Sequence, residues 1–171
     1  VFRVISAATL IMLLLFTTAF AASPSFRTQT LTALVETFDD HTEIRFNNVA
    51  NSVEPHKMNI AWMPDGYQTE FEEFHESRMI ISAEGKNGES LSIAATAISK
   101  NRSYSFDTEG ATEEPATVQG NEATVYQMKT EDGDKITVLW TDMEKGWIVR
   151  VTGYNISKED MLRISENVEI R

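Results

Sequence analysis

A run of uncharged, mostly apolar residues at positions 4–22 limits what this chain can fold into more than any other feature. A helix of this length rises about 28 Å at roughly 1.5 Å per residue, close to the ~30 Å hydrocarbon thickness of a bilayer. Its few polar members are Ser and Thr, whose hydroxyls can bond the carbonyl of the preceding turn. The run predicts a transmembrane helix, and Arg3 marks its cytoplasmic end.

The same residues also fit a cleaved secretory signal. In that interpretation Arg3 precedes the apolar stretch, and Ala19-Phe20-Ala21 is a small-x-small cleavage site. Both interpretations place the chain from Ser23 onward on the extracytoplasmic side of the membrane. Because the sequence opens with Val and not Met, we expect further cytoplasmic residues before Val1, and we favour the retained anchor over the secreted form.

The chain after residue 22 is acidic and contains no cysteine. Without Arg3 it carries 14 basic and 26 acidic residues, which is a formal charge of −12. Such a field repels phosphate backbones, so we expect no nucleic-acid partner, whereas cations and basic partners are tolerated. Neither disulfides nor Cys-ligated metals are available. Residues 23–171 suffice for one domain with a real core.

The segment directly after the apolar run has the marks of a helix. Ser23 is a candidate N-cap with Pro24 at the first helical position, and apolar residues then repeat at helical spacing up to Phe38. We expect an amphipathic helix from about Pro24 to Phe38, within a juxtamembrane segment at 23–41. A position in the lipid headgroup layer is disfavoured because its polar side lacks Lys and Arg.

Residues 42–171 are rich in strand patterns. The first part predicts strands at 42–46, 58–63, 68–77, 78–85 and 90–99, with turns at Pro64-Asp65-Gly66 and Asn87-Gly88. Residues 100–117 are polar and acidic and hold Gly110 and Pro115, so they predict a long surface loop.

The last third predicts a meander of strands at 117–130, 135–143 and 147–154, followed by a terminal helix that Ser157 caps. Met161, Ile164 and Val168 would line one side of that helix. A symmetric final hairpin would place Trp140 opposite Trp147, Val138 opposite Val149 and Ile136 opposite Val151, on a face that should be core.

These elements predict an α+β protein. A transmembrane helix at 1–22 would be followed by an extracytoplasmic domain at 42–171. In that domain an antiparallel β-sheet of about six to eight strands would pack with the juxtamembrane helix and a C-terminal helix.

Several ordered landmarks resemble those of a known family. They are Trp62 to Tyr67, Asp107-Thr108-Glu109, Gly120 to Ala123, Ile136 to Trp140 and Met161 to Ile164. Together they resemble family 4367 of the domains of unknown function over about Phe46 to Val168, with Gly110 standing where the family would have Asn. The resemblance implies a Firmicute protein whose domain sits outside the membrane behind a single transmembrane helix. It implies no site residues, since the family has no established activity, and it points to sensing or regulation of the anti-sigma kind.

The sequence offers only weak candidates for metal-binding or catalytic residues. His75 beside Glu73 and His41 beside Asp39 are the only hints of a metal site, and solvated surface positions explain them better. We therefore expect no metal, no cofactor and no catalytic residues. The aromatic residues Trp62, Tyr67, Tyr104, Phe106 and Tyr126 could include a ligand-stacking platform, although such residues more often belong to the core or its rim.

The leading hypothesis is a membrane-anchored extracytoplasmic domain that binds or senses something without catalysis, as part of a membrane-bound regulator. Its partners would be the membrane, through residues 4–22, and an unknown protein or envelope ligand. One alternative is a cell-wall hydrolase that uses paired carboxylates, with Glu72, Glu73 and His75 as candidates. Another is a secreted or structural accessory domain that holds a partner through residues 100–117.

Overall fold

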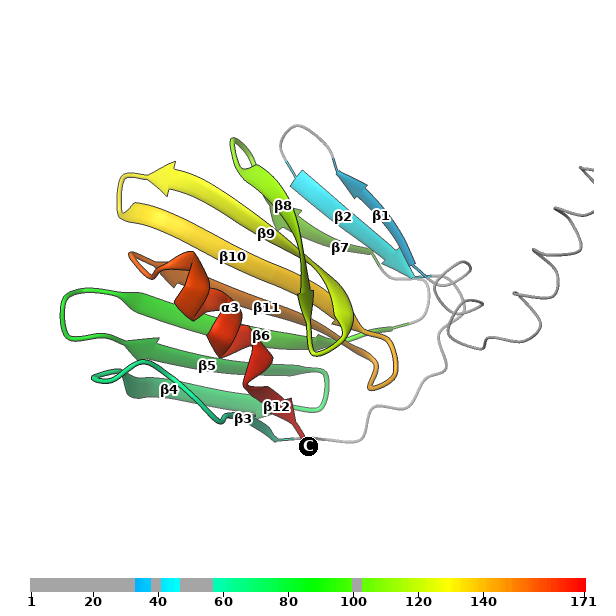
Figure 1. The fold of residues 1–171 in the computed structure, drawn as a ribbon. Helices are drawn as coiled ribbons and strands as arrows, with labels where there is room; N and C mark the ends of the chain where they lie inside the picture. The colour runs from blue at the N-terminus through cyan, green and yellow to red at the C-terminus, as the bar shows by residue number, and fades with distance from the viewer. Residues whose placement is uncertain (1–32, 38–40, 47–56, 100–102) are drawn as a thin grey trace, which may run out of the picture.

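A seven-stranded antiparallel sheet organises the part of the chain that the computed structural model describes, residues 33–37, 41–46, 57–99 and 103–171 (Figure 1). Its strand order is β4-β5-β6-β11-β10-β9-β8. The strands are β4 (Gln68–His75), β5 (Arg78–Glu84), β6 (Ser90–Ala97), β8 (Thr112–Val118), β9 (Asn121–Thr130), β10 (Gly133–Asp142) and β11 (Trp147–Tyr154).

Short turns join most neighbouring strands of this sheet. The turn between β5 and β6 is built on Asn87-Gly88, and Gly88 has a φ of +85°, a conformation that an L side chain rarely adopts. β6 instead pairs with β11, far along the sequence, with Ile93 opposite Val151. The middle of the sheet therefore depends on a contact that no local turn specifies.

One face of the sheet is covered by the only helix in the described residues, α3 (Lys158–Glu166), and by a two-stranded ribbon of β3 (Met58–Ile60) and β12 (Val168–Ile170) (Figure 1). Ser157 caps α3, since its hydroxyl accepts a hydrogen bond from the Asp160 backbone N–H. Gln119, in the turn between β8 and β9, donates its side-chain amide to the Val168 carbonyl at 2.6 Å and so ties the start of β12, just after the helix, to the large sheet. The main core lies under α3 and includes Met161, Ile164 and the inward residues of β5, β6 and β9 to β11.

The opposite face carries a second, three-stranded sheet of β1 (Ala33–Thr37), β2 (His41–Phe46) and β7 (Ser103–Asp107), in the order β1-β2-β7. Ile44 and Phe46 of β2 are buried in a second apolar cluster with Tyr126, Leu139 and Ile148 of the large sheet. The large sheet is thus buried on both faces around β9, β10 and β11.

The predicted antiparallel sheet, a hairpin at Asn87-Gly88, the meander of β9 to β11 and the cap at Ser157 are confirmed. A two-residue turn at Asn87-Gly88 is not, because the loop spans residues 85–89 and Glu84 lies opposite Ser90. The α+β fold class is wrong, because the described residues are mostly strands with one short helix. The juxtamembrane helix is wrong over residues 33–37, which pair with β2 as strand β1. Pairing with the neighbouring strand β2 outweighs a helical spacing that no partner supports. The rest of the predicted helix lies outside the described residues.

The predicted transmembrane segment at 4–22 also lies outside the described residues. Within the part that is described, no helix is both long enough and apolar enough to cross a membrane.

Three finer predictions also fail. Residues 100–117 are not one long loop, since β7 pairs with β2 and β8 pairs with β9. In the final hairpin the register is displaced by two residues, so that Trp140 lies opposite Val149 and Val138 opposite Val151. A displacement of two keeps every side chain on its face, so the predicted core face is unchanged. Val168 belongs to β12 and not to the terminal helix.

Candidate functional site

A polar groove lies on the face of the large sheet opposite α3, where the end of β7 meets strands β6, β11, β10 and β9. It encloses a cavity of about 230 Å³. A smaller cavity of about 160 Å³ adjoins it and shares the side chains of Phe106 and Arg150. The second sheet covers only part of the large one, and the groove occupies the margin that is left open.

The floor of the groove is a row of hydroxyl groups that crosses four strands. The strand register places Ser92 opposite Thr152, Thr152 opposite Thr137, and Thr137 opposite Tyr126. The Thr137 and Thr152 hydroxyls lie 3.2 Å apart and share a hydrogen bond. Neighbouring strands are about 4.8 Å apart, so the row extends about 14 Å across the sheet. Such a row can donate and accept hydrogen bonds along an extended polar ligand.

Arg150 stands two residues along β11 from Thr152, on the same face and therefore about 7 Å from the row. Its guanidinium carbon lies 5.6 Å from the centre of the Phe106 ring, so the ring holds the side chain over the sheet. No carboxylate of the described residues forms an ion pair with it. A half-buried guanidinium without an anion retains donors for a carboxylate or phosphate.

The surroundings of Arg150 increase the local positive charge. Burial lowers the pKa of the Arg150 guanidinium, and the nearby charge of Arg78 lowers it further. The guanidinium still stays protonated at neutral pH, because its ordinary pKa is far above 7. Lys135 lines the far side of the same cavity, and Asp107 is the one carboxylate among its lining residues. In a chain of net charge −11 this concentration of cationic groups is unusual.

A buried hydroxyl cluster forms one end of the groove. The hydroxyl of Thr42 on β2 lies 3.2 Å from the hydroxyls of both Thr108 and Tyr126. Burial raises the pKa of the Tyr126 phenol, which therefore stays neutral and able to donate. This cluster connects the small sheet, the residue that follows β7 and strand β9. The position of the covering sheet and the groove are thus linked through hydrogen bonds.

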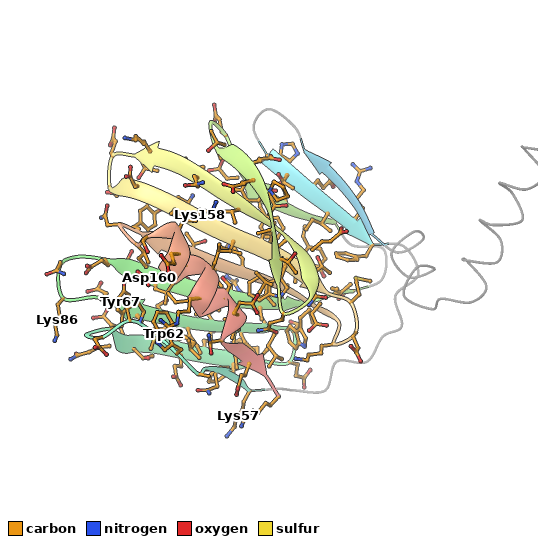
Figure 2. The ribbon with its side chains drawn as sticks, in the orientation of Figure 1. Lys57, Trp62, Tyr67, Lys86, Lys158 and Asp160 are labelled. Carbon is orange, nitrogen blue, oxygen red and sulfur yellow. The ribbon has the colours of Figure 1, made fainter. Side chains whose placement is uncertain are left out.

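The sequence-derived candidates fall in different places. Phe106 and Tyr126 line the groove, and Tyr104 packs beside it with its hydroxyl donating to the Ala97 carbonyl at 2.7 Å. Trp62 and Tyr67 lie on the helix side of the sheet (Figure 2), where Arg163 stacks over the Trp62 ring at 3.9 Å. The predicted aromatic set is therefore split between the two faces.

The weak metal and catalytic candidates do not come together. Glu72, Glu73 and His75 all lie on the edge strand β4, and none of them lines the groove. Glu73 and His75 make an exposed hydrogen bond of 2.7 Å. His41 is on β2, and Asp39 lies outside the described residues. Across the described ranges, no group of three or more His, Asp or Glu side chains could hold a metal ion.

Sequence reasoning missed Arg150 and the hydroxyl row as a site. The sequence contains one signal for Arg150, because this residue interrupts the apolar sequence Trp-Ile-Val-Arg-Val of β11. An arginine between two core valines must either face solvent or meet a partner on the second face. The hydroxyl row had no such signal, because its members come from four strands and align only through the register.

By its fold and its groove, the protein is a β-sheet domain with a polar, cationic groove between two antiparallel sheets. A family model described as Domain of unknown function (DUF4367) matches residues 57–168 of the 171, and the chain belongs to that family. No curated protein and no solved structure matches the chain.

Proposed function

We propose that the chain is a non-catalytic binding domain that works on the extracytoplasmic side of a membrane and holds an anionic, hydroxyl-rich ligand in the groove at Arg150. The observation that carries this proposal is the half-buried Arg150 guanidinium, which stacks on Phe106 and has no carboxylate partner among the described side chains. Removing a cation from water is costly unless an anion compensates it, and a bound ligand would supply that anion.

The ligand class follows from the two parts of the groove. Arg150 offers a planar fork that suits a carboxylate, and the row from Ser92 to Tyr126 offers hydroxyl groups on four neighbouring strands. A sugar acid or a hydroxy acid has both features. The overall negative charge of the protein would repel an anion elsewhere on the surface, so binding would be confined to this cationic margin.

The extracytoplasmic placement is supported by the uncharged run at residues 4–22, which directs the following chain across the membrane whether it is retained or cleaved. The resemblance to Firmicute proteins that stand outside the membrane agrees with it. In that setting the domain would report ligand binding to a membrane-bound regulator of the anti-sigma kind. Trypsin added to intact cells should degrade the domain, and protection of the domain in intact cells would contradict the placement.

The ligand proposal is tested with glucuronate and glucose, which differ in one carboxylate. Calorimetric titration of the full chain in non-ionic detergent should show binding of glucuronate and much weaker binding of glucose. Because charge-assisted hydrogen bonds contribute about 1.5–3 kcal/mol, Arg150→Gln should weaken glucuronate binding roughly tenfold to a hundredfold.

Arg163→Gln is the matched control, because Arg163 also stacks on an aromatic ring but lies on the helix side of the sheet. It should leave glucuronate binding unchanged. Equal binding of glucose and glucuronate, or unchanged binding by Arg150→Gln, would contradict the proposed site. The hydrolase alternative would be favoured instead if cell-wall fragments were turned over and the turnover were lost on Glu72→Gln or Glu73→Gln.

A further inference from the structure

The two edge strands of the large sheet differ in how readily they could pair with a further strand. β8 forms one edge and contains Pro115, which has no backbone N–H to offer a further strand. β4 forms the other edge and contains no proline in its eight residues. No strand within the described residues pairs with the outer side of β4. Among the described strands, none occupies the backbone donors and acceptors on that side, which can pair with an added strand.

The exposed apolar side chains point to the same edge. Among the described residues, the large hydrophobic side chains that are exposed are Phe71, at 49%, and Phe74, at 39%, and both lie on β4. Phe71 is opposite Ser82 and Phe74 opposite Met79, so the register places the two rings on opposite faces of the sheet. An added strand would cover one ring on each face with its own alternating side chains.

The charge of β4 indicates which strand could be added. Glu70, Glu72 and Glu73 are on the strand and Glu76 follows it, against the single His75. A second copy of this chain would bring the same carboxylates opposite one another, which is unfavourable. A segment rich in Lys or Arg would instead place a cation beside each carboxylate.

We propose that the outer edge of β4 is a docking edge for an extended, basic segment of a partner protein, which adds a strand to the seven-stranded sheet beside Phe71 and Phe74. This edge is separate from the groove, because no residue of β4 lines either cavity. The docking edge can therefore exist whether or not the groove binds an anion.

The test uses a capped octapeptide of alternating Lys and Val as the probe and the full chain in non-ionic detergent at physiological salt. We expect saturable binding, measured by fluorescence anisotropy, together with slower hydrogen exchange of the β4 amides. A second peptide with the same charges, N-methylated at alternate amides on its pairing side, should lose the binding because it cannot donate to the edge.

Glu72→Lys should weaken binding of the probe roughly tenfold, since it exchanges an attraction for a repulsion next to Phe71. Glu113→Lys is the matched control, because Glu113 is an exposed glutamate on the proline-containing edge strand β8, and it should leave the affinity unchanged. The proposal is overturned if the probe does not bind, if the N-methylated peptide binds equally well, or if Glu113→Lys weakens binding as much as Glu72→Lys. In those cases the glutamates of β4 serve only to keep the edge unpaired.

Discussion

Replacing Trp140 by alanine tests whether the face of the sheet under α3 is the main core. Trp140 lies near the end of β10 and is 3% exposed. Its neighbours across the sheet are Ala123 on β9 and Val149 on β11. Both neighbours are small and sit on strands that are paired on both sides. The space left by the indole can therefore be filled only in part, and most of it should remain as a cavity.

The expected loss in the free energy of unfolding follows from the surface area of the indole that is buried on folding. A buried aromatic side chain covers about 150–250 Å². At about 25 cal/mol per Å² this area is worth roughly 4–6 kcal/mol, and the alanine keeps a minor part of it. Measured Trp→Ala costs in cores are about 3–5 kcal/mol. We expect a loss in this range, which is a large fraction of a typical total stability of about 5–15 kcal/mol.

The assay is urea unfolding of the full chain in non-ionic detergent, followed by far-ultraviolet circular dichroism. Thr141→Ala is the control, because Thr141 is the next residue of β10, points to the other face and is half-buried. It should cost about 1 kcal/mol or less. A loss below about 1 kcal/mol for Trp140→Ala would refute the assignment of this face to the core.

Two further predictions concern the helix and the groove. A Cβ at Gly153 would lie 2.5 Å from the Met161 sulfur and 2.8 Å from Cδ1 of Ile156. Gly153→Ala should therefore lower the free energy of unfolding, measured in urea, by about 1–3 kcal/mol. An unchanged free energy of unfolding would mean that α3 does not pack closely against β11. Because burial raises the pKa of Tyr126 above 10.0, the folded state favours the protonated phenol. The stabilisation of the folded state by the neutral phenol is present below pH 10 and is lost as the pH rises through the pKa of the folded state. The melting temperature should therefore fall less steeply above pH 10 in Tyr126→Phe than in the original chain. Equal slopes would show that the phenol titrates alike in both states.

The elements that the sequence predicted well are those with a local cause. The Asn87-Gly88 pair specifies its hairpin through the φ of glycine, and Ser157 specifies the start of α3 through one side-chain hydrogen bond. Alternation of apolar residues also placed Val138, Trp140 and Val149 on one face. It did so even though the predicted pairing was displaced by two residues, because alternation determines the face and the turn determines the register.

The elements that it missed take their conformation from the strands that they pair with. β7 forms because it pairs with β2, which places Phe106 opposite Thr42 across a separation of more than sixty residues. β1 was predicted as helix because its spacing alone is compatible with one. A short segment without a strong intrinsic preference adopts the conformation that its partner requires.

The sequence by itself determined the acidic charge, the absence of cysteine, the uncharged run at 4–22 and the hairpins of the sheet. Each of these depends on composition or on residues close to one another in the chain. Only the tertiary structure decided that Arg150 meets Phe106 and that Ser92, Thr152, Thr137 and Tyr126 form one row. A groove between two sheets depends on the register of several strands and on where the smaller sheet ends, and neither is encoded in any single segment.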